Sequence, residues 1–112
     1  MTSVRDLIEP IACRVLCGDA LDSIQVTGGY ACDLLSWVIS HIQTGEVWMT
    51  ILNSVNVVAV AVLSECSCIL LTENVGMPED VLNRAREKGL VVLSTPLSTY
   101  EAAARLSALL PQ

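Results

Sequence analysis

The strongest constraint on the fold is a strand-like segment that recurs at nearly even spacing. Short runs rich in Val, Ile and Leu begin near positions 47, 69 and 90, which are 22 and then 21 residues apart. A parallel crossover needs about a dozen or more residues between its strands, so each interval has room for one helix. The recurrence predicts an α/β domain with a mainly parallel sheet of about four to five strands and helices on both faces.

Two of the connecting segments carry clear helix signals. One begins at Pro78, has acidic residues in its first turn and basic residues toward its end, and stops at Gly89. The other begins with a capping box formed by Ser98 and Glu101 and runs to Pro111. We therefore expect the first segment to be a helix that connects two parallel strands, and the second to be a helix that follows the last strand.

The segment 53–65 is ambiguous, because its five valines favour a strand by propensity. Its length of about 13 residues between two strands fits a crossover helix, and Asn53 or Ser54 supplies an N-cap. We interpret it as a helix, with a β-hairpin as the alternative.

The N-terminal part is predicted from weaker signals. A short helix near the start frays around Pro10, and residues 14–17 and 24–26 form two brief strands. Apolar spacing predicts a helix over residues 31–42, followed by a central strand over residues 47–52.

The segment Thr27-Gly28-Gly29 makes the most specific backbone demand in the chain. Paired glycines let a ligand approach the main chain closely, and the helix predicted just after them would present free backbone amides. This combination predicts a binding site for an anion or another polar ligand.

Hydroxyl side chains follow several predicted strands, at Thr50, Thr72, Ser94 and Thr95. They would lie at the carboxyl edge of the sheet, where open α/β sheets usually bind ligands. The alternative is that these hydroxyls close turns and that the neighbouring asparagines are plain helix caps. The predicted ligand-binding residues are Thr27, Gly28, Gly29, Thr50, Asn53, Asn56 and Thr95.

Composition points to self-association. Hydrophobic residues make up 53% of the chain and charged residues only 16%, against about 45–50% and about 25% in ordinary soluble domains. The excess apolar surface predicts a homodimer. Trp37 and Trp48 are candidate interface anchors, although tryptophans more often lie in the core.

The net charge of −6 argues against nucleic acid as a partner, because nucleic-acid affinity depends on neutralising phosphates. The longest apolar run, residues 57–63, is far shorter than the roughly 20 residues that span a bilayer, and the start of the chain lacks a secretion signal. We expect a soluble, cytoplasmic protein that does not bind membranes.

The cysteines and the single histidine do not form a convincing catalytic set. The five cysteines include no Cys-x-x-Cys pair and are interpreted as buried, reduced thiols. His41 lies on the polar side of a helix, and any activation of Cys32 at a helix start is opposed by Asp33. We expect no metal, no cofactor and no enzymatic activity.

The sequence resembles the DRTGG domain over nearly its whole length, so residues 1–112 are predicted to be one such domain. The resemblance rests on Thr27-Gly28-Gly29-Tyr30, on Asp33-Leu34-Leu35-Ser36 and on Leu93-Ser94-Thr95. Similar domains accompany the HPr kinase/phosphorylase catalytic domain, phosphate acetyltransferases and pyrophosphatases that carry CBS domains. In those settings the resemblance implies a regulatory or assembly role.

Two departures from the family narrow this expectation. Gln25-Val26 stands where the family has Asp-Arg, so an anion contact from that arginine is absent, and the chain has no Walker A segment. The first hypothesis is therefore a non-catalytic, homodimeric module that binds a nucleotide, such as an adenine nucleotide, or another small polar metabolite. The alternative is a protein–protein adaptor without a small ligand.

Overall fold

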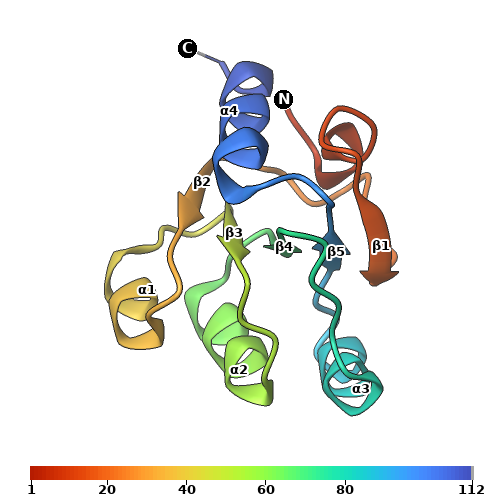
Figure 1. Cartoon of the computed structure of the whole chain (residues 1–112), viewed down its shortest axis with the longest axis vertical. Coiled ribbons are helices and arrows are strands. Elements are labelled where there is room, and N and C mark those ends of the chain that lie inside the picture. Colours follow the sequence, from red (N-terminus) through yellow and green to blue (C-terminus); the bar gives the residue numbers. More distant parts are fainter. Residues whose placement is uncertain (112) are drawn as a thin grey trace.

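The computed structural model describes residues 1–111, which form a five-stranded sheet between two layers of helices (Figure 1). The strand order is β1-β5-β4-β3-β2; strands β2 to β5 are parallel and β1 is antiparallel to β5. The strands are β1 (Arg14–Cys17), β2 (Gly28–Ala31), β3 (Glu46–Thr50), β4 (Cys68–Leu71) and β5 (Val92–Ser94). The predicted α/β fold with a mainly parallel sheet is confirmed.

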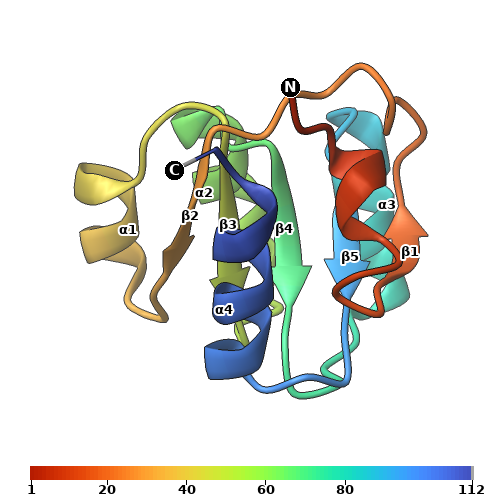
Figure 2. The ribbon, with the colours of Figure 1, turned by 90° about the horizontal axis from the view of Figure 1, so that it is seen from above.

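Helices cover both faces of the sheet, as predicted (Figure 2). The first face carries α1 (Leu35–His41), α2 (Val55–Ser64) and α3 (Glu79–Glu87). The second carries the 3-10 turn η1 (Val4–Leu7) and α4 (Thr99–Leu109). Strand side chains alternate between the faces, so Trp48 packs in the first layer of core and Met49 in the second.

Helix α2 confirms the interpretation of the valine-rich segment as a crossover. Val57, Val58 and Val60 are buried against the sheet and the neighbouring helices. Burial of these side chains outweighs their weak helix propensity, because tertiary packing supplies most of the stability of a helix. The β-hairpin alternative is wrong.

The capping signals of the last two helices are also confirmed. Gly89 follows α3 with a φ of +68°, a backbone conformation that glycine adopts without strain. The side chain of Ser98 accepts a hydrogen bond of 3.2 Å from the backbone amide of Glu101 at the start of α4.

The N-terminal half differs more from the prediction. No strand forms over residues 24–26, where Gln25 makes only an isolated bridge with Ser3; the strand β2 begins at Gly28 instead. The first helix is a single 3-10 turn, and α1 begins at Leu35 rather than near Ala31. These elements are short and depend on distant packing partners, so local sequence signals place their bounds poorly.

The two tryptophans have different environments. Trp48 is fully buried, and its Nε1 donates a hydrogen bond of 3.0 Å to the carbonyl of Cys32, so it is a core residue and not an interface anchor. Trp37 is 53% exposed and stacks on His41, with 4.1 Å between the ring centroids.

None of the helices within residues 1–111 has the length and apolar character needed to cross a bilayer.

Candidate functional site

The structure divides the seven predicted site residues between the two ends of the sheet. Gly28 and Gly29 lie in the first half of β2, in register with Glu46 and Val47 at the start of β3. They therefore lie at the amino edge, opposite the carboxyl edge where Thr50 ends β3 (Figure 2). The prediction that the glycines join the carboxyl rim is wrong.

Gly29 is needed for packing. A Cβ built on Gly29 would lie 2.5 Å from Cδ2 of Leu106 and 3.0 Å from Cε of Met49, so the missing side chain lets α4 rest directly on β2. Thr27 just before the strand is also used by the fold: its backbone amide donates to Gly45 and its hydroxyl to the carbonyl of Thr44.

At the carboxyl edge, Asp33 fixes the end of β3. Its carboxylate accepts a hydrogen bond of 2.6 Å from the Thr50 hydroxyl and one of 3.1 Å from the backbone amide of Ile51. The Thr50 oxygen in turn accepts from the amide of Leu52 at 3.1 Å. In the sequence analysis Asp33 was placed in the first turn of a helix, and this role was missed. The available signal was that Asp33 follows the strand β2 and Thr50 ends the neighbouring parallel strand β3.

The remaining hydroxyls of this edge are also engaged within the fold. Thr95 is fully buried and donates to the carbonyl of Ile11 at 2.6 Å. Ser94 donates to the carbonyl of Val75 at 2.7 Å. The Thr72 hydroxyl lies 2.6 Å from that of Thr99. These hydroxyls therefore hold loops of the domain together, in agreement with the alternative that they serve the fold and not a ligand.

The start of α2 is where polar groups of the carboxyl edge remain available. The side-chain amide of Asn53 donates to the carbonyl of Gly76 at 2.9 Å, which ties the β3–α2 loop to the β4–α3 loop. Within residues 1–111, no hydrogen bond engages the side chains of Ser54 or Asn56, and both are exposed. The first backbone amides of a helix lack acceptors inside that helix. Asn53, Ser54 and Asn56 therefore form a small group beside unpaired amides, which we call the α2 start.

A family comparison identifies the domain. The sequence pattern of the DRTGG domain matches residues 6–109. The chain belongs to the DRTGG domain family. This confirms the resemblance inferred from the Thr27-Gly28-Gly29 and Asp33-Leu34-Leu35-Ser36 motifs. No curated protein matches the sequence significantly.

The DRTGG fold is also seen in a solved structure. It comprises the CBS and DRTGG domains of the regulatory region of Clostridium perfringens pyrophosphatase, complexed with the activator diadenosine tetraphosphate. The TM-score is 0.71 at 13% identity, and the match covers 98% of this chain and 48% of that one. The present chain thus spans about half the length of that structure.

In this DRTGG domain the position of the family's arginine belongs to the core. Val26 is only 6% exposed, and its backbone amide donates to the carbonyl of Thr2 at 2.8 Å. A buried valine makes no charged contact with an anion, so Val26 does not supply the anion contact that the family resemblance leads one to expect from an arginine.

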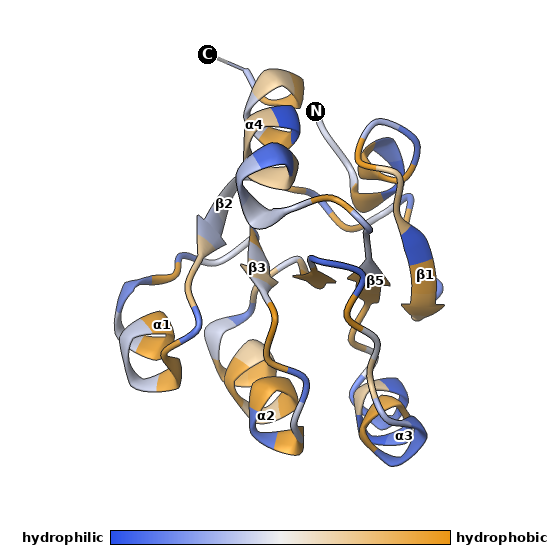
Figure 3. Ribbon diagram, in the orientation of Figure 1, coloured by the Kyte–Doolittle hydropathy of each residue, from blue (hydrophilic) through white to orange (hydrophobic). Residues whose placement is uncertain are grey.

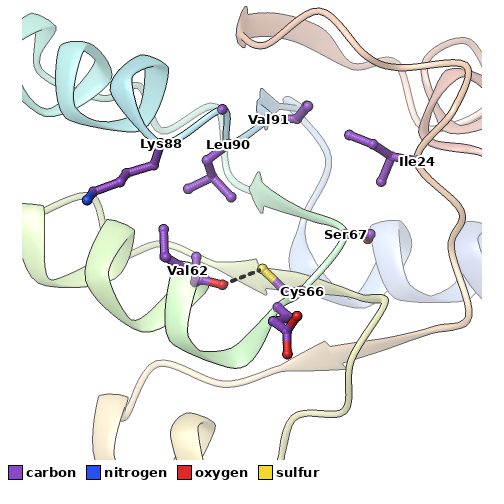
Figure 4. Close-up of a pocket in the computed structure, with 10 residues that line it drawn as sticks. Ile24, Val62, Cys66, Ser67, Lys88, Leu90 and Val91 are labelled. Carbon is purple, nitrogen blue, oxygen red and sulfur yellow. Dashed lines mark hydrogen bonds between the residues drawn. The ribbon is translucent and has the colours of Figure 1, made fainter.

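A shallow hollow of about 250 Å³ lies at the amino edge, where α2 and α3 end (Figure 4). Ile24, Val62, Leu90 and Val91 contribute apolar surface, and Lys88 points away from Cys66 and Ser67. The Cys66 thiol donates to the carbonyl of Ala61 at 3.7 Å. Burial raises the pKa of this thiol to about 11, so at neutral pH it is protonated and a poor nucleophile.

Burial also raises the pKa of three other thiols, those of Cys13, Cys17 and Cys68. The pKa of Cys13 rises to about 11, and that of Cys68 rises further. Cys17 and Cys68 are buried and the other three cysteines are partly buried. All five are free thiols. In the part of the chain that the structure describes, no three His, Cys, Asp or Glu side chains lie close enough together to hold a metal ion.

Proposed function

We propose that this DRTGG domain is a non-catalytic, homodimeric regulatory module that senses a nucleotide or another small polar metabolite at the α2 start. The observation that carries the proposal is the contrast within the carboxyl edge. There the hydroxyls of Thr50, Thr72, Ser94 and Thr95 are engaged inside the fold, whereas the Ser54 and Asn56 side chains face solvent.

The chemistry of the α2 start suits an anionic group. Backbone amides at a helix N-terminus attract negative charge, and α2 has no acidic residue in its first turn to compete. Adenine nucleotides are the first class to test, because the regulatory region of similar fold was crystallised with diadenosine tetraphosphate. The proposed ligand contacts are Asn53, Ser54 and Asn56, with Thr50 and Asp33 holding the adjacent loop.

Thermal unfolding in the presence of a ligand panel tests the proposal. Adenine mononucleotides, diadenosine tetraphosphate and sugar phosphates would each be added in excess. A ligand at 100 times its Kd stabilises the folded state by about 2.7 kcal/mol. For a domain of this size that corresponds to a rise in Tm of roughly 10 °C. A panel with no effect on Tm would overturn the ligand-sensing proposal.

A pair of isosteric variants locates the site. Asn56→Asp adds a negative charge that repels an anionic ligand, yet an acid in the first turn of a helix does not harm the fold. Asn83→Asp adds the same charge on α3, where the new carboxylate still accepts the hydrogen bond from Arg86. Loss of the thermal shift in Asn56→Asp and its retention in Asn83→Asp would support the α2 start.

The adaptor alternative is favoured by a different observation. Apolar side chains are exposed at the N-cap of α1 and on α2, including Leu34 at 60% and Leu63 at 71%. If this domain is purely an adaptor, protein recovered from its native cell would carry a stable heteromeric partner, and no small ligand would change its Tm.

A further inference from the structure

The exposed side of helix α2 is apolar except for Asn56 in its first turn. Its buried side packs on the sheet, while Val55, Ala59, Val62 and Leu63 are exposed on the outer side; we call these four residues the α2 face. In Figure 3 most of α2 is hydrophobic apart from a hydrophilic segment near its start, whereas α3 is largely hydrophilic. A helix that is apolar all round is normally buried. The α2 face is therefore incompletely covered in a single chain.

The α2 face combines a protruding side chain with a hollow. Leu63 is 71% exposed. Next to it, a hollow of about 230 Å³ lies between α2 and α3, lined by the α2 face together with Val58, Arg84 and Lys88. A surface that carries both features can fit a copy of itself across a two-fold axis, because each copy then offers Leu63 to the hollow of the other.

We propose that a second copy of this chain packs its α2 antiparallel against the α2 face, with the two-fold axis near Ala59. Val55, Ala59 and Leu63 are spaced four residues apart and lie on one side of the helix. In an antiparallel pair centred on Ala59, Val55 of each copy meets Leu63 of the other. The small Ala59 allows the two helix backbones to approach closely.

Charge favours the same arrangement. Residues 55–64 contain no charged side chain, so two copies with a net charge of −6 each can meet there without direct repulsion. Helix α3 lies beside α2 in the same layer and starts with the acids Glu79 and Asp80 (Figure 1). Its end carries Arg84, Arg86 and Lys88 against one acid, Glu87, which pairs with Arg84, so that end keeps a net positive charge. Antiparallel packing brings the basic end of each α3 toward the acidic start of the other.

This inference rests on the homodimer of the proposed function and assigns its surface. Sedimentation of the wild-type protein over a wide concentration range should show a dimer. Leu63→Asp should raise the dimer Kd at least about 30-fold, a loss typical of a central interface residue. Tyr100→Asp is the matched control, because Tyr100 is 83% exposed on α4, on the opposite face, and its replacement should leave the Kd unchanged.

A cysteine variant tests the antiparallel register. Ala59→Cys places two thiols at the two-fold axis, within the roughly 4.4–6.8 Å separation of Cα atoms that a disulfide needs. Mild oxidation should therefore yield a covalent dimer from Ala59→Cys, and not from the wild type or from Tyr100→Cys.

The outcomes separate the two proposals. A wild-type dimer that Leu63→Asp leaves intact, or Ala59→Cys protein that fails to cross-link, overturns the assigned surface and leaves the homodimer standing. Monomeric wild-type protein overturns both the surface and the dimer part of the proposed function. The thermal-shift assay measures the ligand part separately, and it can be repeated on Leu63→Asp protein.

Discussion

Replacing Gly29 with alanine should destabilise the domain although glycine is unusual inside a strand. The new methyl group would lie 2.5 Å from Cδ2 of Leu106, which is only 2% exposed. Either α4 moves away from β2 or Leu106 leaves its packed position, and both responses disturb the core between the sheet and α4.

The size of the loss follows from two opposing effects. Overpacking a core position costs about 1–3 kcal/mol. Replacing glycine with alanine also lowers the conformational entropy of the unfolded chain, which stabilises the folded state by about 0.4–1 kcal/mol. The net expectation for Gly29→Ala is a loss of about 1–2 kcal/mol in the free energy of unfolding.

Urea denaturation measures this loss, with an unchanged m-value indicating a change in stability alone. Gly28→Ala is the matched control in the same strand. Its Cβ would meet only the side chain of Glu46, whose nearest atom, Oε2, lies at 3.1 Å. Gly28→Ala should therefore range from neutral to stabilising by about 1 kcal/mol.

A double-mutant cycle identifies the cause. Leu106→Ala removes the nearest clashing atoms and leaves the 3.0 Å contact with Cε of Met49, so Gly29→Ala should cost much less in that background. If Gly29→Ala is tolerated as well as Gly28→Ala, or if its cost persists in the Leu106→Ala protein, the assignment of Gly29 to α4 packing is refuted.

Two further predictions concern Asp33 and the buried thiols. Asp33→Ala should lower the free energy of unfolding, measured by urea denaturation, by about 1–3 kcal/mol, because the buried Thr50 hydroxyl loses its acceptor. Asp33→Asn keeps one acceptor oxygen and should lower it less. Equal losses in the two variants would contradict this role of Asp33. Burial raises the pKa of Cys13 and Cys66 from 9.0 to about 11, so the unfolded chain releases protons before the folded one does. Tm should therefore fall as pH rises from 9 toward 11, less steeply in Cys66→Ala, and a Tm that is flat over this range in the wild type would contradict the burial of these thiols.

The sequence was most informative where spacing and local signals agreed. The even recurrence of strands placed a helix over the valine-rich segment against its propensity, and α2 confirms it. Gly89 after α3 and Ser98 as the N-cap of α4 are local signals of three or four residues, and both are confirmed. The reciprocal half of the capping box does not form, because the Glu101 side chain bonds to Arg105. The parallel direction of the central strands follows from the same crossover rule.

The paired glycines were misplaced because their cause lies far away in the chain. Gly29 is required by contact with Leu106 on the last helix, and no local pattern contains that information. A Gly-Gly pair before a helix also resembles a ligand loop, so the local signal pointed to the wrong edge of the sheet. Asp33 was missed for a related reason: its partner, Thr50, is reached across the neighbouring strand.

The antiparallel pairing of β1 with β5 joins the first strand of the chain to the last. Arg14 lies opposite Ser94, so β1 has no partner until β5 has been synthesised. The segment from β3 to β5 can assemble its parallel crossovers earlier, because its contacts span shorter stretches of chain. On the ribosome, the amino-terminal region should therefore wait unstructured and complete the sheet in a late step of folding.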